Sequence, residues 1–354
     1  MKSGKQNRDL SRREFIKKTS IGALGATLFS GVPSIMKGAL IKNEAVSKSK
    51  VVLIQNSKVI NSNGEVNSEI LNEMIETAIT NFSGEKKSSD YWKKNFSMDD
   101  IIGLKVNTLG LSNIAGSTAT NHFQAVTSSL INSFVSAGYK DEKFIIWDRS
   151  EDELKSAGFV IQKEIGKTRV LGNIGTRSGD GGEGYSTEEL KVGEKSTRLS
   201  KILTDMTSAM INIPLMKDHG TAGITGALKN HYGTINNARD FHSNNATSPG
   251  IPDINLLNGI RSKQKLVIMD ALMRVFNGGP RWDRNYMWPF GGILISTDPV
   301  AIDSVMFGLI NEKRTAEGLS PITEERAKHL RLSSELGLGK YKSEDIELVK
   351  INLG

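Results

Sequence analysis

The chain has 354 residues, no cysteine, and 46 Lys and Arg against 39 Asp and Glu, so its formal net charge is +7. Without cysteine, it has no disulfide, iron–sulfur cluster or thiolate metal site. Six of the seven net charges belong to residues 1–47, which hold nine basic and three acidic side chains. The rest of the chain is nearly neutral and therefore predicts no nucleic-acid partner.

The first segment has the layout of a twin-arginine (Tat) export signal. Arg12 and Arg13 stand in Ser-Arg-Arg-Glu-Phe-Ile-Lys-Lys, and a Gly- and Ala-rich apolar stretch follows at 21–32. The layout predicts a signal and linker over 1–47, the Tat translocase as a partner, and a periplasmic or membrane-anchored protein that faces outward. Proteins on this route cross the membrane folded, often with a cofactor already bound.

Cleavage of this signal stays open. A small-residue pair typical of a cleavage site occurs at Ala45 and Ser47, far from the apolar stretch, and residues 31–40 offer nothing better. The stretch is shorter than the roughly 20 residues of a membrane-spanning helix. Membrane contact is therefore expected only through the N-terminal signal, if it is not cleaved.

Residues 48–354 alternate apolar runs of strand length with helical patterns, which predicts an α/β domain with a mainly parallel sheet flanked by helices. The Gly- and charge-rich middle, about 150–205, is a candidate insertion. Strands are predicted over 51–54, 101–106, 143–147, 210–216, 266–269 and 346–351. Helices are predicted over 69–82, 123–137, 300–310 and 324–336.

Polar residues follow four of these predicted strands. They are Lys105 and Asn107, Asp148, the Lys217–His219 segment, and Asp270. A turn or a helix cap would explain any one of them alone. Because ligands of open parallel sheets lie beyond the carboxyl ends of the strands, the four together predict a shared ligand crevice.

The segment 217–233 is the densest in polar groups. It combines three glycines at a spacing of three with Thr225, Lys217, Lys229 and His219. A Gly- and Thr-rich turn between strand and helix exposes backbone N–H groups and can hold an anion, with lysine as the counter-charge. It is not a Walker P-loop, because the Gly-Lys-Ser/Thr ending is absent.

A divalent metal is a second expectation for this crevice. His219, Asp270, Asp148 and His242 offer the imidazole and carboxylate groups that bind such ions. Each histidine alone is as readily explained by a structural hydrogen bond.

Two aspartates mark the start of the helix predicted over 300–310. Asp298 is expected to cap it, with Pro299 as its first residue. Asp303 falls in an otherwise apolar stretch, so a buried partner is expected for its carboxylate.

Together these motifs resemble the domain-of-unknown-function family 362 (DUF362), from about residue 51 to the C-terminus. The residues that carry the resemblance are Lys105-Val-Asn107, Asp148, Lys217-x-His219, Thr225-Gly-Ala-Leu-Lys-Asn-x-x-Gly233, Asp270 with Gly278-Gly-Pro280, and Asp298-Pro-Val-Ala-x-Asp303. The usual Lys-Pro-Asn and Lys-Thr-His of the family stand here as Lys105-Val-Asn107 and Lys217-Asp-His219. The resemblance implies the grouping and the crevice, and no particular reaction.

The residues of the crevice fit two functions. The first is an exported metal- or cofactor-dependent enzyme for a small anionic or oxygen-rich molecule, with Lys217, His219 and Lys229 as catalytic candidates. The second is a non-catalytic protein that binds a small molecule or assists maturation of a redox partner. The candidates for holding a cofactor of unknown identity are Lys105, Asn107, Thr225, Gly226 and Asn230.

Overall fold

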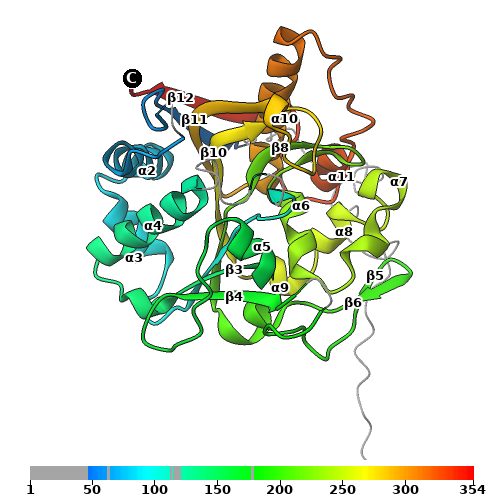
Figure 1. Cartoon of the computed structure of the whole chain (residues 1–354). Helices are drawn as coiled ribbons and strands as arrows, with labels where there is room; N and C mark the ends of the chain where they lie inside the picture. The colour runs from blue at the N-terminus through cyan, green and yellow to red at the C-terminus, as the bar shows by residue number, and fades with distance from the viewer. Residues whose placement is uncertain (1–46, 62–63, 112–113, 115–120, 177–178) are drawn as a thin grey trace, which may run out of the picture. The chain divides into compact units, whose positions relative to one another are not determined.

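A ten-stranded, mainly parallel sheet runs through the protein (Figure 1). The computed structural model describes residues 47–61, 64–111, 114, 121–176 and 179–354. Eight strands form the main order: β12 (Ile346–Asn352), β1 (Ser49–Gln55), β11 (Met287–Ser296), β10 (Gln264–Val275), β7 (Ala209–Asn212), β2 (Ile102–Lys105), β3 (Phe144–Ser150) and β4 (Arg169–Ile174). Beside them, β8 (Leu215–His219) pairs with β10 and with β9 (Gly223–Thr225). Only the pairs β1–β11, β10–β11 and β8–β9 of this sheet are antiparallel, so the predicted α/β class is confirmed.

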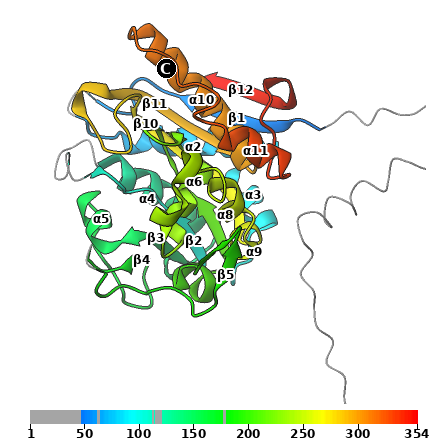
Figure 2. The ribbon, with the colours of Figure 1, turned by 90° about the vertical axis from the view of Figure 1, so that its right-hand side faces the viewer.

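Helices cover both faces of this sheet, as the two side views show (Figures 1 and 2). One face carries α2 (Ser68–Ser83), α3 (Ser88–Asn95) and α4 (Asn121–Ser136). The other carries α6 (Ala227–Asn230), α8 (Ile251–Asn255), α10 (Pro299–Ala316) and α11 (His329–Glu335). Shorter elements complete the described chain: α5 (Glu151–Ser156), α7 (Ser243–Ala246), α9 (Asn258–Arg261) and the hairpin of β5 (Leu190–Val192) with β6 (Lys195–Thr197).

Alternating apolar side chains in the strands build one core on each face. In β1, Val52 and Ile54 pack into the core under α2, whereas Val51 and Leu53 pack into the core under α10. Side chains of successive strand residues point to opposite faces, so a strand buried on both sides reads as a continuous apolar run. This explains why the apolar run 51–54 predicted the strand β1.

Two predicted strands have different limits in the structure. The run predicted as one strand over 210–216 is two strands, β7 and β8, because Pro214 lies between them and has no N–H to donate to a ladder. The strand predicted over 266–269 extends from Gln264 to Val275. Asp270 therefore lies in the middle of β10, not at its end.

Two other segments also bear on the predictions. Residues 150–205, the candidate insertion, contribute β4 to the main sheet, where it pairs with β3. The proposed export signal lies outside the described residues. No helix that the structure describes is both long and apolar enough to cross a membrane.

The first strand is completed by the last part of the chain. β1 pairs with β11 on one side and, over seven residues, with β12 on the other. Both neighbours come from the C-terminal 70 residues, so β1 holds the two ends of the described chain together.

Candidate functional site

A cavity of about 330 Å³ lies beyond the carboxyl ends of β2 and β3. The turn after β9, helix α6 and two 3₁₀ helices, η5 (His231–Thr234) and η6 (Ala238–Phe241), close it from the other side. Its lining residues are Asn107, Leu109, Asp148, Arg149, Glu153, His219, Thr225, Lys229, Asn230, Tyr232, Gly233, Ala238, Arg239 and His242. The predicted position, at the carboxyl edge of a mainly parallel sheet, matches this cavity.

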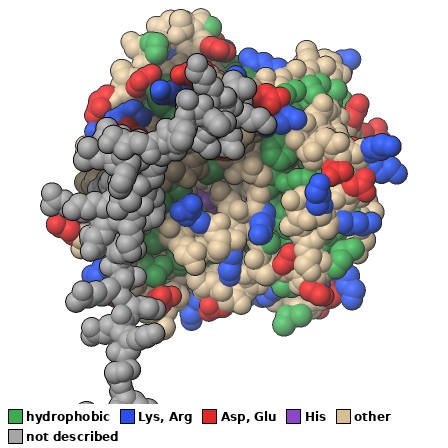
Figure 3. Space-filling model, turned by 180° about the vertical axis from the view of Figure 1, so that it is seen from behind, with side chains coloured by type: hydrophobic (Ala, Val, Ile, Leu, Met, Phe, Trp, Pro, Cys, Tyr) green, Lys and Arg blue, Asp and Glu red, His purple; other side chains and the backbone are tan. Residues whose placement is uncertain are grey.

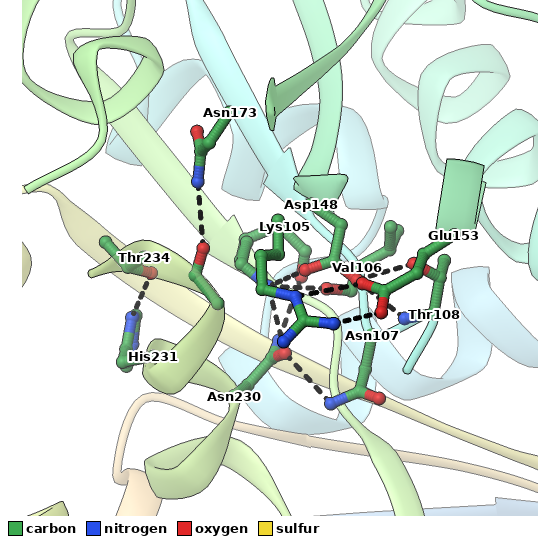
Figure 4. Close-up of polar contacts among 12 residues, drawn as sticks. Lys105, Val106, Asn107, Thr108, Asp148, Glu153, Asn173, Asn230, His231 and Thr234 are labelled. Atoms are coloured by element: carbon green, nitrogen blue, oxygen red, sulfur yellow. Dashed lines mark hydrogen bonds and ion pairs between the residues drawn. The ribbon is translucent and has the colours of Figure 1, made fainter. Parts of the chain in front are cut away.

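The floor of the cavity is a buried ion pair (Figure 4). Lys105 Nζ donates to Asp148 Oδ1 at 2.6 Å and to the carbonyl of Val106 at 2.7 Å. The backbone N–H and the hydroxyl of Thr108 both donate to Asp148 Oδ2 at 2.7 Å. Burial opposes ionisation of Asp148, but Lys105 and these hydrogen bonds hold the pKa of its carboxyl below the ordinary value. Asp148 is therefore a paired carboxylate with both oxygens in use.

Asn230 joins this floor to α6. Its Oδ1 accepts from Lys105 Nζ at 3.1 Å and from Asn107 Nδ2 at 3.2 Å. Its Nδ2 donates to the Lys105 carbonyl and to Asn212 Oδ1. These partners fix which way both amides point, so Asn107 keeps its Oδ1 free of any described partner.

Asp303 holds the turn that opens α6. Its carboxylate accepts from the backbone N–H groups of Ala227 and Leu228, at 2.6 and 3.0 Å. These N–H groups have no partner within so short a helix, and the negative charge suits a helix N-terminus. A side chain at Gly226 would overlap this carboxylate, so only glycine fits there. The partner expected for Asp303 is thus backbone, and burial raises the pKa of its carboxyl to about 7.

Lys217 lies behind the cavity wall. It is fully buried, and its Nζ donates to the carbonyls of Leu109 at 2.8 Å and Pro280 at 3.3 Å. Burial lowers its pKa to about 8. Lys217 ties two loops together and does not line the cavity.

His219 has a fixed tautomer. Its Nδ1 accepts from the backbone N–H groups of Thr221 and Ala222, both at 3.1 Å. Two donors facing Nδ1 require a lone pair there, so Nε2 carries the proton. Burial, and then the neighbouring cations, lower the pKa of the ring far below its ordinary value. His219 is a neutral group that offers one N–H.

Lys229 reaches the cavity from α6. Its Nζ lies 3.2 Å from His242 Nε2 and 3.8 Å from the ring centre of Tyr232. His242 Nδ1 donates to the Ala238 carbonyl at 3.0 Å, so Nε2 is the acceptor for Lys229. Burial and the charge of Lys217 lower the pKa of Lys229 to about 7.

Together these groups form a basic cluster, which we define as Lys217, His219, Lys229, His242 and His329. No described carboxylate lies within ion-pair distance of either lysine in it. On the face of the protein seen from behind, a small area of histidine is visible beside a basic side chain (Figure 3). Burial lowers the pKa of each of the three histidines, so the two lysines are the cationic members of the cluster, and neither has a carboxylate partner among the described residues.

Asp270 does not belong to this site, and its prediction as a crevice residue is wrong. Its Oδ2 lies 2.7 Å from His122 Nδ1, and its Oδ1 accepts from the N–H of Leu272. The apolar run ends at Asp270, but β10 continues to Val275, so the carboxylate is buried within the sheet.

Three of the predicted metal ligands, Asp148, His219 and His242, line the cavity, but they are not close enough together to hold an ion. Within residues 47–354, as far as the structure describes them, no three His, Asp or Glu side chains are grouped to hold a metal ion. His219 fits the role poorly, because its Nδ1 already accepts two N–H groups and its Nε2 carries the proton. The same protonation argues against His219 as a general base.

Several lining residues were missed in the sequence. Arg149 and Glu153 form an ion pair on one wall, and their spacing of four just after a strand was the available signal. Tyr232 lies inside the dense segment 217–233, and Arg239 follows six residues after its end. His329, in α11, is fully buried and is one of the groups that lower the pKa of His219.

The fold and the site define an α/β protein with a cavity at the carboxyl edge of its sheet that is lined in part by basic side chains. Residues 102–308 match the family described as Domain of unknown function (DUF362). This match covers more than half of the chain, so the chain belongs to the DUF362 family, as its motifs suggested. A comparison with curated proteins finds no match.

One solved structure is similar in part. It is a crystal structure of a Thermotoga maritima protein from the Northeast Structural Genomics Consortium, with a TM-score of 0.40 and 12% identity. The similarity covers 77% of this chain and 60% of the other, so this chain spans less than two thirds of that protein. At this level it carries no argument about function.

Proposed function

We propose that this protein is an exported enzyme that binds a small anionic, oxygen-rich molecule in the cavity beside Lys229. The observation that carries the proposal is the basic cluster, in which no described carboxylate neutralises either lysine. Burying cations without partners is costly. A bound anion would offset that cost, which is the usual reason for keeping such a group in a cavity.

The lining residues take separate roles in this proposal. Lys229 and the exposed Arg239 attract the negative charge, and the Nε2–H of His219 donates to a ligand oxygen. Asn107 Oδ1 and Thr225 Oγ1 have no described hydrogen-bond partner, and both residues line the cavity. They would accept from, or donate to, hydroxyl groups of the ligand.

A divalent metal is not part of this proposal, because the charge of the site suits an anion and its two carboxylates are already paired. Export rests on the Ser-Arg-Arg-Glu-Phe-Ile-Lys-Lys sequence alone.

Titration calorimetry with glycolate, succinate and inorganic phosphate tests the binding step. The tightest of these ligands should lose at least tenfold in affinity in Lys229→Gln. Lys140→Gln, a change at a side chain that is 78% exposed, is the matched control and should bind as the wild type does. Equal affinity in wild type and Lys229→Gln would contradict the proposal.

A non-catalytic binding protein is the second candidate. It is favoured by the pairing of both cavity carboxylates, Asp148 with Lys105 and Glu153 with Arg149, because no carboxylate is left as a base. Proton NMR of a bound ligand during long incubation separates the two. A binder returns the ligand unchanged, whereas an enzyme converts it.

A further inference from the structure

Lys229 differs from the other buried lysines in what surrounds its amine. Lys105 is paired with Asp148, and Lys217 donates to two loop carbonyls away from the cavity. Lys229 alone of these three lines the cavity, and its recorded hydrogen-bond partner is a histidine nitrogen. That environment is typical of a lysine that reacts and not of one that only holds charge.

We infer that Lys229 is a nucleophilic amine that forms a Schiff base with a small 2-oxo acid bound in the cavity. The inference rests on the proposed function and deepens it by naming the substrate class. Two requirements select that class. The amine needs a carbonyl carbon to attack, and the positive wall needs a carboxylate.

The surroundings favour the neutral amine that such an attack requires. Lys229 is 6% exposed, and the charge of Lys217 lies nearby. Its pKa, lowered to about 7, agrees with this geometry. The ring of Tyr232 favours the charged form instead, so both protonation states are accessible near neutral pH.

His242 is placed to move the protons. Its Nδ1–H is held by the Ala238 carbonyl, which leaves the Nε2 lone pair facing Lys229 Nζ at 3.2 Å. His219 cannot take this role, because its Nε2 already carries a proton. It would instead donate that N–H to the oxygen on which negative charge develops.

The reaction balances without any further reactant. The Nζ lone pair attacks the carbonyl carbon, a C–N bond forms, and the π electrons of the carbonyl move to its oxygen. One Nζ proton passes through His242 Nε2 to that oxygen and gives a carbinolamine. The second follows the same route as the C–O bond breaks, so water leaves and a C=N bond remains.

Trapping with pyruvate and sodium cyanoborohydride tests the inference on the full-length chain. Peptide mapping by mass spectrometry should find one reduced adduct, on the peptide that contains Lys229. Lys229→Arg keeps the positive charge but cannot form the imine, so it should give no adduct. Lys140→Arg should give as much adduct as the wild type, and His242→Gln should slow its formation about tenfold or more.

Three results would overturn the inference: no adduct in the wild type, an adduct spread over exposed lysines, or an adduct of wild-type yield in Lys229→Arg. A thermal melt checks that Lys229→Arg is folded, and Lys229→Gln replaces it if it is not. Calorimetry with the same pyruvate separates this failure from failure of the proposed function. If pyruvate binds but is not trapped, the Schiff-base inference is wrong and the proposed anion site is still supported. If neither pyruvate nor any other anion binds, both the inference and the proposed function are wrong.

Discussion

Breaking the buried pair of Lys105 and Asp148 should destabilise the protein strongly. Both side chains are almost inaccessible, at 0% and 5% exposure, and among the described residues Lys105 is the side-chain partner of Asp148 Oδ1. Lys105→Met would leave a carboxylate charge in the interior with the two hydrogen bonds from Thr108 as its described support. The loss of one member of a buried pair costs about 3–5 kcal/mol of unfolding free energy.

Urea denaturation followed by circular dichroism measures this cost, and a double variant identifies its origin. If the unpaired charge is responsible, Lys105→Met with Asp148→Asn should recover more than half of the loss. Lys94→Met, which breaks an exposed pair with Glu85 at 2.9 Å, is the control and should cost less than about 1 kcal/mol. The reasoning would be refuted if Lys105→Met cost no more than this control.

Three further predictions concern pH and export. Folding raises the pKa of Asp303 from about 4 in the unfolded chain to about 7. Its contribution to the free energy of unfolding is therefore fully present below about pH 4 and is lost as the pH rises through about 7. Asp303→Asn should flatten this part of the plot of unfolding free energy against pH, measured by urea melts between pH 4 and 8. Lys229 loses its charge near pH 7, so the affinity for a permanently charged anion such as sulfate should fall between pH 6 and 8 in calorimetry, and an unchanged affinity would argue against Lys229 as the anion partner. Changing Arg12 and Arg13 to lysine should keep the protein in the cytoplasm, and recovery of wild-type levels in the exported fraction would contradict the signal.

The arrangement of the sheet was largely predictable because its strands are buried on both faces. Continuous apolar runs such as 51–54 have few alternative structures in a chain of this composition. Which strands pair with one another was harder to predict from the sequence. β11 was missed because its first half, from Met287, is partly exposed and contains Pro289, which weakens the pattern of a strand, and it becomes fully buried only where it crosses the core.

The candidate site was predictable where a polar residue ends an apolar strand. Lys105 ends β2, and Asp148 lies two residues before the end of β3; the two side chains lie together in the floor of the cavity. Asp270 follows the apolar run 266–269 but lies outside the cavity, because β10 continues beyond this run and pairs with β11 as far as Val275. The sequence could not show which atoms of each side chain already have hydrogen-bond partners. For His219 this decides the chemistry, because the two N–H groups that donate to Nδ1 place the proton on Nε2.

The pairing of β1 has a consequence for biosynthesis. Ser49 is aligned with Ile346, about 300 residues later in the chain. At about 5–20 residues per second, the first strand waits roughly 15–60 s on the ribosome before its second neighbour exists. During that time its apolar residues are an open edge that chaperones can bind and other chains can join. Ribosome-bound chains that stop before β12 should therefore be cut readily by protease near β1, and completed chains should resist.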